Sequence, residues 1–592
     1  MNLMARQWSA LALRICLLGL MLLWPRAGQD ASRPAAEAAN GMVVSAHRLA
    51  SEAGMVILQQ GGNAIDAAVA IGYAEAVVNP CCGNVGGGGF LVAHLKDGGN
   101  VFLNFRETAP AAATPDMYLD GQGNVARGAS LYGWRAVAVP GTVMGLDTAL
   151  TQYGTLPRSV VMAPAIRLAR EGFELTRYDT DILQRGTAQF RRDGNAARIF
   201  LHPDGSPLQP GERLVQPGLA ATLASIAADG PRAFYRGRIA EAVETASRAG
   251  NGIVTAADFA AYHVTQSSPL SCTYRGYVFL SAPPPSSGGV TLCEILHVLE
   301  GYDLRALGFH SARAVHLMTE AMRHAYFDRN TYLGDPDFVT NPLTKLLSSD
   351  HAAAIRTHIG DRAMPSGALA PGIAPHEQME TTHYSVMDRE GNAVAVTYTL
   401  NGSFGAGVMA GDTGFLLNDE MDDFTVKPGV SNLFGMVQGE ANAISPGKRP
   451  LSSMAPTVVL HDGRVFLVLG SAGGPRIITV ILETALNILD YGMAPQEAVD
   501  APRLHHQWLP DEILVERFAL SADTQALLRD MGYRIREQTP WGSCELIQVG
   551  PPTTGPSAAS SGTDAAASNR MRPGFFYGAS DSRRPVGAAI GY

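Results

Sequence analysis

The chain has 592 residues, a formal net charge of −9, 46% hydrophobic residues and 17% charged residues. This composition predicts a globular protein with a large core, either one or two large domains or about four domains of average size. The acidic balance and the lack of a long basic stretch argue against nucleic-acid binding.

The first 28 residues have the features of an export signal. Arg6 supplies positive charge, and an apolar stretch that Arg14 interrupts ends at Trp24. The uninterrupted apolar run of residues 15–24 is shorter than the ~20 residues that a membrane-spanning helix needs. We therefore expect a cleaved signal and a periplasmic or secreted protein, with a membrane anchor formed by an uncleaved segment as the alternative.

Six cysteines are present: Cys16, Cys81, Cys82, Cys272, Cys293 and Cys544. Their spacing matches no zinc motif. Export would permit disulfides, but loss of Cys16 with the signal leaves an odd number, so at least one thiol stays unpaired within the chain. The adjacency of Cys81 and Cys82 argues against a strain-free bridge between them.

Residues 42–80 are rich in small residues and are expected to be helical, followed by strands at 90–95 and 101–105. The intervening "CCGNVGGGGF" contains many glycines, but a helix precedes them and a strand follows. A phosphate-binding loop requires the reverse order, so we expect a sharp turn and no nucleotide.

Residues 141–346 are expected to be mostly helical, and residues after 381 mostly strand, with a helix at 477–489. Residues 551–573 are of low complexity and are expected to form a mobile surface insertion. No internal repeat of fixed period is present.

The junction "METTHYSVM" changes from a Pro- and Gly-rich loop to an alternating strand at Thr381. A five-residue turn at 388–392 predicts a hairpin that pairs Met387 with Ala393. In that register Thr381 lies opposite Thr399, and Asn401 follows just beyond the strand end. One residue of slippage would change these pairs.

Cleavage between Glu380 and Thr381 would give Thr381 a free α-amine with a reference pKa of ~7.7–8. Such an amine can act as the general base for the threonine's own hydroxyl. A strand-start threonine without a catalytic role is the simpler interpretation of the Thr-Thr pair taken alone.

Downstream, "GSAGGPRIIT" lies between an apolar strand and a helix. The backbone N–H groups of Gly473 and Gly474 at this helix start are candidates for an oxyanion hole. A serine nucleophile at Ser471 is a rival interpretation, but Leu469 occupies the position where a nucleophile elbow requires glycine.

Together with "NFRETAP", "GGNAIDAAVA", "NDEMDDF" and "KRPLSSMAPT", these stretches resemble the γ-glutamyltransferase (γ-glutamyltranspeptidase) family over nearly the whole mature chain. The resemblance implies an α+β N-terminal-nucleophile hydrolase fold, a four-layer αββα sandwich. It also implies a precursor that cleaves itself into a large subunit of residues 29–380 and a small subunit of residues 381–592, which stay together as a heterodimer.

The resemblance also implies the roles of individual residues. Thr381 is the implied nucleophile, and Thr399 and Asn401 are implied to contact it and the glutamyl group. Glu420 and Asp423 resemble the acidic pair that holds the substrate α-amine. The implied α-carboxylate clamp consists of Arg106, Ser452 and Ser453, and Gly473 and Gly474 resemble the oxyanion hole. An arginine fork suits a carboxylate, and carboxylates suit an ammonium group.

The chain departs from the family pattern at two positions near the expected site. Ala472 stands where the family often has proline, and Phe434 replaces a tyrosine that bacterial members often carry in the loop that covers the site. The sequences beginning at His376 and at His505 do not form metal-binding motifs. No metal or cofactor is expected.

We therefore predict an exported enzyme that cleaves γ-glutamyl bonds, as in glutathione, through an acyl-threonine intermediate. Water, amino acids or peptides accept the glutamyl group. The alternatives are a glutaryl- or cephalosporin-type acylase of the same fold, or an uncleaved and inactive binding protein.

Overall fold

The computed structural model describes residues 32–126, 128–368, 381–551 and 571–592, and residues Ala35–Tyr592 form one compact unit. The predicted signal, Glu380, His376 and most of the low-complexity stretch lie outside the described residues. None of the helices within the described ranges has the length and apolar character needed to cross a bilayer.

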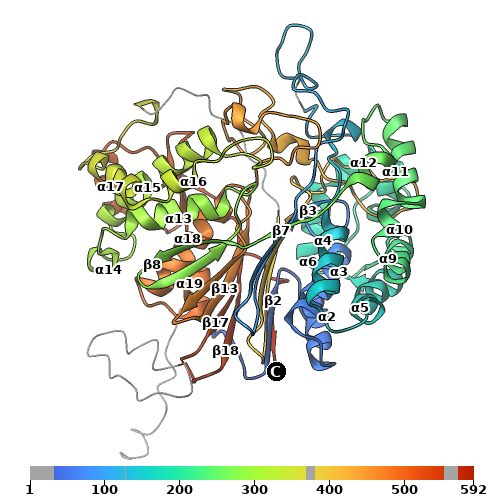
Figure 1. The fold of residues 1–592 in the computed structure, drawn as a ribbon, viewed down its shortest axis with the longest axis horizontal. Coiled ribbons are helices and arrows are strands. Elements are labelled where there is room, and N and C mark those ends of the chain that lie inside the picture. The colour runs from blue at the N-terminus through green and yellow to red at the C-terminus, as the bar shows by residue number, and fades with distance from the viewer. Residues whose placement is uncertain (1–31, 127, 369–380, 552–570) are drawn as a thin grey trace, which may run out of the picture. The chain divides into compact units, whose positions relative to one another are not determined.

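Two seven-stranded sheets occupy the centre of this unit (Figure 1). The strand order of the first sheet is β1 (Ala36–Ala38), β18 (Phe576–Ser580), β17 (Ser543–Val549), β13 (Arg464–Ala472), β12 (Thr457–His461), β9 (Tyr277–Ser281) and β8 (Leu270–Tyr274). The order of the second sheet is β19 (Ala588–Gly591), β2 (Gly41–Ser45), β10 (Thr382–Asp388), β11 (Ala393–Thr399), β3 (Gly88–His94), β4 (Asn100–Phe105) and β7 (Thr265–Ser267). Smaller sheets contain β5 (Phe173–Glu174) with β6 (Arg213–Leu214), and β14 (Leu504–His505), β15 (Ile513–Glu516) and β16 (Ile535–Gln538).

Helices cover the outer face of each sheet (Figure 1). The second sheet is covered by helices from the first half of the chain, α2 (Arg48–Gln59), α3 (Ala64–Val78), α4 (Thr142–Tyr153), α5 (Arg158–Glu171), α6 (Arg177–Arg185), α7 (Thr187–Phe190), α8 (Gly194–Phe200), α9 (Pro217–Asp229), α10 (Arg232–Tyr235), α11 (Arg238–Ala249) and α12 (Ala256–Ala261). On the side of the first sheet lie α13 (Gly288–Leu299), α14 (Leu304–Leu307), α15 (Ala312–Tyr332), α16 (Leu343–Leu346), α17 (Ser349–His358), α18 (Arg476–Leu489), α19 (Pro495–Asp500) and α20 (Ala522–Asp530).

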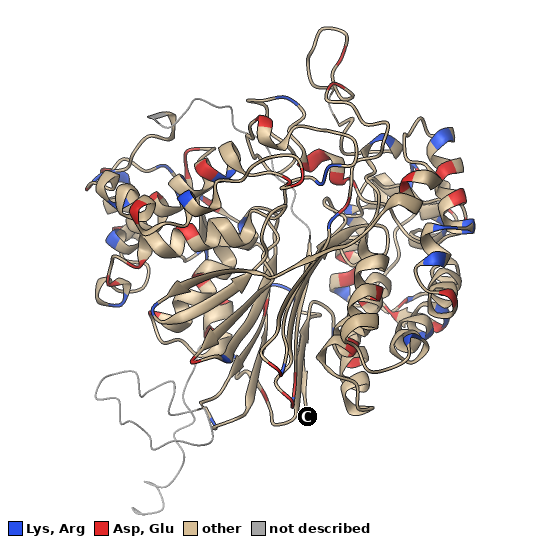
Figure 2. Ribbon diagram, in the orientation of Figure 1, with Lys and Arg blue, Asp and Glu red and all other residues tan. Residues whose placement is uncertain are grey.

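Alternation along the strands divides the core into two parts. In β2, Val43 belongs to the apolar cluster beneath α2–α5, whereas Met42 and Val44 join the cluster between the sheets. Successive strand residues point to opposite faces, so a strand buried on both sides contributes to both clusters. Charged residues lie mostly on helices and loops (Figure 2). These layers confirm the predicted αββα sandwich.

Helix α3 supports the strand that follows Thr381. Asn63 caps it by accepting from the N–H groups of Ile65 and Asp66, and the Asp66 carboxylate accepts from the N–H of Asn63. This reciprocal capping satisfies backbone donors at the start of the helix. A Cβ added to Gly72 would lie 2.7 Å from the Tyr384 hydroxyl of β10, so glycine permits the close approach of helix and strand.

The structure corrects two expectations about secondary structure. The segment expected to be helical from residue 42 begins instead with strand β2, because its Val-Val run pairs with β10 and β19. Strands β8 and β9 interrupt the region expected to be mostly helical. The predicted strands at 90–95 and 101–105 and the helix at 477–489 are confirmed as β3, β4 and α18.

Candidate active site

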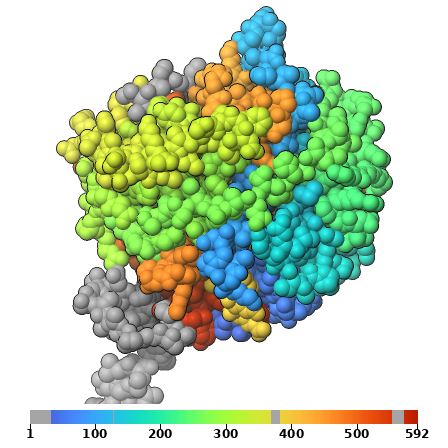
Figure 3. All heavy atoms as spheres, in the orientation of Figure 1, coloured from blue at the N-terminus to red at the C-terminus, as the bar shows by residue number. Residues whose placement is uncertain are grey.

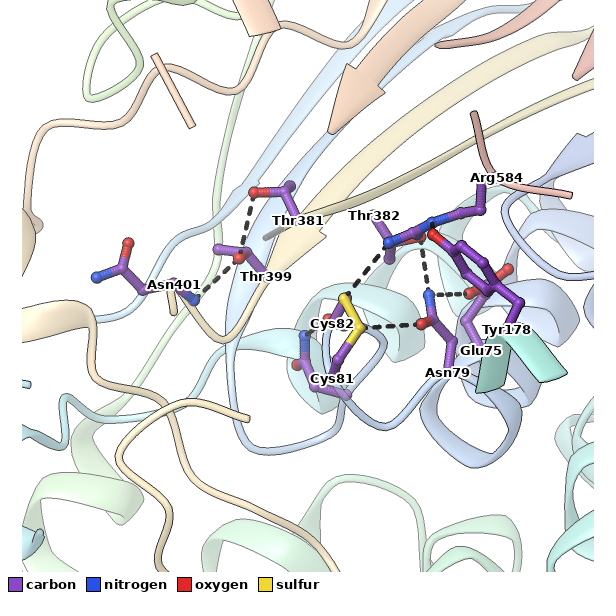
Figure 4. Close-up of a disulfide and its surroundings, with 11 residues drawn as sticks. Glu75, Asn79, Cys81, Cys82, Tyr178, Thr381, Thr382, Thr399, Asn401 and Arg584 are labelled. Atoms are coloured by element: carbon purple, nitrogen blue, oxygen red, sulfur yellow. Dashed lines mark hydrogen bonds between the residues drawn. A yellow bond between two sulfur atoms is a disulfide. The ribbon is translucent and has the colours of Figure 1, made fainter. Parts of the chain in front are cut away.

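The threonine hairpin has the predicted register. Met387 pairs with Ala393 and Thr382 with Tyr398, so Thr381 and Thr399 face each other across its open end. Their Oγ1 atoms are 3.5 Å apart, and both residues are buried (Figure 4). The Thr399 hydroxyl also accepts from the Asn401 N–H at 2.9 Å. Either hydroxyl can donate in the contact between Thr381 and Thr399.

Asn401 connects this hairpin to the acidic segment. It adopts a left-handed conformation with φ of 79°, which asparagine tolerates better than most residues. Its side-chain amide donates to the Asp419 carbonyl at 3.1 Å, and the Gly402 N–H donates to the Asp419 carboxylate at 2.8 Å. The turn after β11 thus fixes the position of the 3-10 helix Glu420–Asp423 beside Thr399.

Arg106 lies just after β4 and contacts the predicted acidic pair. Its two terminal nitrogens donate to Glu420 and Asp423, and its Nε donates to the Pro450 carbonyl at 3.1 Å. The Arg106 side chain is 1% exposed, and the Glu420 side chain is fully buried. The guanidinium therefore lies between two carboxylates from one turn of the chain.

Negative charge exceeds positive charge around Arg106. Glu107 is a third carboxylate, 3.6 Å from the guanidinium. Burial raises the pKa of Glu420 and Asp423 despite the attraction of Arg106, and raises the pKa of Glu107 to about 7. Buried carboxylates without enough positive partners are costly. The site therefore favours an additional cation.

These groups surround one pocket of about 340 Å³, a volume that includes solvent at its mouth. Its lining includes every predicted catalytic or substrate-binding residue except Gly473, namely Thr381, Thr399, Asn401, Arg106, Glu420, Asp423, Ser452, Ser453 and Gly474. It also includes Arg329, Asn432, Phe434, Met436, Met454, Pro475 and Ile477. Ser471 does not line it, and its hydroxyl donates to the Ala472 carbonyl at 2.7 Å, which is inconsistent with the rival serine nucleophile.

The two glycines after β13 have the geometry of a sharp strand-to-helix turn. Gly473 and Gly474 have φ of 130° and 55°, and α18 begins two residues later. A Cβ on Gly474 would lie 2.8 Å from the Phe434 ring. Backbone conformation favours glycine at both positions, and space also favours it at Gly474. The turn places Gly474, close to the start of a helix, in the pocket wall.

Arg329 is a pocket residue that the sequence motifs do not predict. It belongs to α15, is buried, and donates to Ser453 Oγ at 2.9 Å and to Ser287 Oγ at 2.8 Å. Its other side-chain hydrogen-bond partners in the described part of the chain, Asn330 and Gln438, are neutral too, and burial lowers its pKa to about 10. The "AMRHAYFDRN" sequence gives no local signal for this role, because the partners come from distant segments.

The loop that carries Phe434 is tied down without a tyrosine hydroxyl. The Leu433 N–H donates to Asp422 at 2.7 Å, and Gln507 donates to the Phe434 carbonyl at 3.2 Å. Lys427 donates to the Gly123 carbonyl at 2.7 Å. The space-filling view shows this segment (orange) beside the loop that contains Gly123 (blue) (Figure 3). These bonds hold the loop without the hydroxyl that a tyrosine at position 434 would supply.

The expectation about the adjacent cysteines was wrong. Cys81 and Cys82 form a disulfide in the turn after α3 (Figure 4), where their Cα atoms are 3.8 Å apart. The tight turn brings the two sulfur atoms together. The neighbouring Asn79 amide donates to Glu75 at 2.8 Å and to Thr382 Oγ1 at 3.4 Å. A second disulfide joins Cys272 and Cys293, and the Cys544 thiol is free and buried, as an odd count requires.

Comparisons with known proteins agree with this geometry. A crystal structure of cephalosporin acylase from Bacillus halodurans superposes with a TM-score of 0.81 at 26% identity, covering 96% of this chain and 99% of that chain. The fold is that of the N-terminal-nucleophile hydrolases.

Residues 50–590 match the gamma-glutamyltranspeptidase family, and the chain belongs to that family. It is 54% identical over 564 residues to a glutathione hydrolase proenzyme of Pseudomonas sp. (strain A14), covering 95% of this chain and 96% of that protein. It is 46% identical over 557 residues to a glutathione hydrolase proenzyme of Escherichia coli (strain K12), covering 94% of this chain and 92% of that protein.

Proposed function

We propose that this protein is a self-processing γ-glutamyltransferase that acts on glutathione and other γ-glutamyl compounds. The observation that carries the proposal is the single pocket in which the Thr381 hydroxyl faces an arginine and two carboxylates. A hydroxyl nucleophile supplies the acyl-transfer chemistry, and the charged groups match the zwitterionic end of a γ-glutamyl group.

Processing makes the catalytic base. The Thr381 hydroxyl attacks the carbonyl of Glu380, and the peptide nitrogen leaves as the α-amine of Thr381. Water then hydrolyses the resulting ester, which gives residues 29–380 a new carboxylate and restores the threonine hydroxyl. We infer that this step creates the large subunit and a small subunit of residues 381–592.

In the mature enzyme the α-amine takes the proton of the Thr381 hydroxyl as its oxygen attacks the γ-carbonyl. The backbone N–H groups of Gly473 and Gly474 stabilise the oxyanion, and Thr399 orients the nucleophile. The amine returns the proton to the leaving nitrogen. Water or the amino group of an acceptor then attacks the acyl-threonine, which releases glutamate or a new γ-glutamyl compound.

When the substrate binds, its charged groups become ionic partners of Arg106 and of the acidic pair. The substrate α-carboxylate binds Arg106, Ser452 and Ser453, while its α-ammonium binds Glu420 and Asp423. Without substrate, Arg106 is the cation that pairs with Glu420 and Asp423. With substrate, the ammonium adds the positive charge that the three buried carboxylates favour. Asn401 contacts the bound glutamyl group from the nucleophile side.

An exported location fits two observations. The chain begins with residues that have the pattern of an export signal, and two disulfides occur among the described residues. Disulfides persist in oxidising compartments such as the periplasm. We therefore infer that the enzyme acts on small molecules outside the cytoplasm.

A chromogenic γ-glutamyl anilide tests the proposal. Purified protein should release the aniline, and a dipeptide acceptor should increase the rate and yield a γ-glutamyl dipeptide detectable by mass spectrometry. Activity on a glutaryl anilide with none on the γ-glutamyl anilide would reject the proposal in favour of an acylase, the activity named for the Bacillus halodurans structure.

A further inference from the structure

Three helices of the layer outside the first sheet bring metal-binding side chains together. Glu294 comes from α13, Asp328 from α15 and His351 from α17. His351 Nε2 lies 2.8 Å from Asp328 Oδ2 and 3.3 Å from Glu294 Oε1. One ligand atom from each residue lies within 4.8 Å of the others.

The spacing fits a divalent transition metal. Zinc bonds to histidine nitrogen and carboxylate oxygen are about 2.0–2.2 Å long, and tetrahedral geometry then places neighbouring ligand atoms about 3.3–3.6 Å apart. The 3.3 Å distance from His351 to Glu294 lies in this range, and the 2.8 Å distance from His351 to Asp328 is about 0.5 Å shorter than it. Modest side-chain adjustment therefore converts the present hydrogen bonds into three metal bonds.

The surroundings of the two carboxylates favour a bound cation. Glu294 is 1% exposed and Asp328 is 8% exposed, so two negative side chains meet in a largely buried place. His324 lies four residues before Asp328 on the same face of α15, and its buried Nε2 has no hydrogen-bond partner among the described residues. The His351 side chain is 17% exposed, which leaves a route from solvent.

We propose that Glu294, Asp328 and His351 form a site for a divalent transition metal of the zinc class, with water completing the coordination. The neutral imidazole binds through Nε2, so metal binding releases the proton that His351 shares with the carboxylates. Soft ions such as Cu(I) prefer sulfur ligands, so a set of one imidazole and two carboxylates does not select them.

The site is separate from the pocket, because none of the three ligands lines it. Its effect is structural: the ion fastens α17, the last α-helix before Thr381 in the described chain, to α13 and α15. Asp328 immediately precedes Arg329, which donates to Ser453 in the pocket. The metal thus also fixes the helix that holds Arg329.

Equilibrium dialysis of the untagged, EDTA-treated protein against Zn²⁺ tests the site. We expect one tightly bound ion per chain and a higher Tm in Zn²⁺ than in EDTA. Glu294→Gln, Asp328→Asn and His351→Gln should each weaken binding at least about 100-fold, since even outer-shell changes cost 10–100-fold. His202→Gln removes a partly exposed histidine 3.2 Å from Glu212 and should leave binding unchanged.

Visible absorption of the Co²⁺ form gives a second readout, and the His351→Gln variant should lose its d–d bands. The Tm of each variant in EDTA identifies any variant that fails to fold. If the Glu294 or Asp328 variant does not fold, metal binding by the His351→Gln variant decides the test, because His351 is partly exposed. Absence of stoichiometric binding in the wild type, or equal binding by the folded variants, would overturn the site. These readouts do not involve catalysis, so their failure leaves the γ-glutamyltransferase proposal intact.

Discussion

The two walls of the pocket differ in chemical character. One wall carries the neutral groups Thr381, Thr399, Asn401 and Gly474, and the other carries Arg106 with Glu420 and Asp423. In the proposed mechanism the neutral wall contacts only the reacting atoms and their neighbours, so it suits acyl transfer from many acyl groups. The charged wall fits a substrate that has both a carboxylate and an ammonium group. In this proposal, the residues that perform acyl transfer and the residues that select the substrate therefore belong to separate segments of the chain.

This division is compatible with the structural similarity to a cephalosporin acylase. A fold can keep its nucleophile while the residues that select the substrate change, because function depends on the site and not on the fold alone. Substitutions in the two walls should therefore have different signatures.

Thr381→Ala should abolish both processing and activity, because no hydroxyl remains to attack either carbonyl. We expect a loss on the order of 10⁴-fold or more for every substrate, as for other catalytic nucleophiles. Intact mass should show one uncleaved chain. Thr382→Val, which removes the adjacent hydroxyl, is the matched control and should still yield a small subunit beginning at Thr381. Cleavage of the Thr381→Ala protein would contradict the account.

Arg106→Lys should leave processing intact and reduce kcat/KM for a γ-glutamyl anilide. Lysine cannot form the two-pronged contact with a carboxylate. The loss of a charge-assisted hydrogen bond, ~1.5–3 kcal/mol, corresponds to roughly 10–150-fold. Arg238→Lys, at an exposed ion pair with Asp412, should have no effect. Unchanged kcat/KM in the Arg106 variant would refute the carboxylate assignment.

Asp423→Asn should narrow the preference for γ-glutamyl over glutaryl anilide by about tenfold, mainly by slowing the γ-glutamyl reaction. The estimate follows from the loss of one charge-assisted contact with the ammonium. Asp422→Asn is a matched control, since Asp422 bonds Ser130 and Leu433 and does not line the pocket. If both variants change the ratio of kcat/KM for the γ-glutamyl and glutaryl anilides equally, Asp423 has no specific role in binding the ammonium group.

Phe434→Tyr should have the smallest effect, less than about tenfold in kcat/KM. One neutral hydrogen bond contributes ~0.5–1.5 kcal/mol, and the loop is already held by Asp422 and Gln507. Measurement of hydrolysis and transfer rates checks this expectation. A gain above a hundredfold would show that the loop is poorly anchored without the tyrosine hydroxyl.

The sequence was most informative where local rules determine the structure. The turn length fixed the register that brings Thr381 to Thr399, and the alternation of the strand fixed its faces. The motifs carrying Arg106, Glu420 and Asp423 identified a charged wall that the structure brings to one pocket.

Other features depend on partners that are distant in sequence. Strand β2 is extended because β10 and β19 pair with it, although its own residues were also compatible with a helix. Arg329 lines the pocket only because α15 packs beside the Ser453 segment. The Cys81–Cys82 bridge depends on the turn after α3, whose shape the adjacency of the two residues did not reveal.

The most direct test of the account is the wild-type preference between two anilides that differ only in the α-ammonium group. Buried carboxylates left without their cation reject the analogue that lacks it. The account predicts a kcat/KM for the γ-glutamyl anilide at least about a hundredfold above that for the glutaryl anilide. Equal values for the two substrates would contradict the role of the charged wall and favour an acylase.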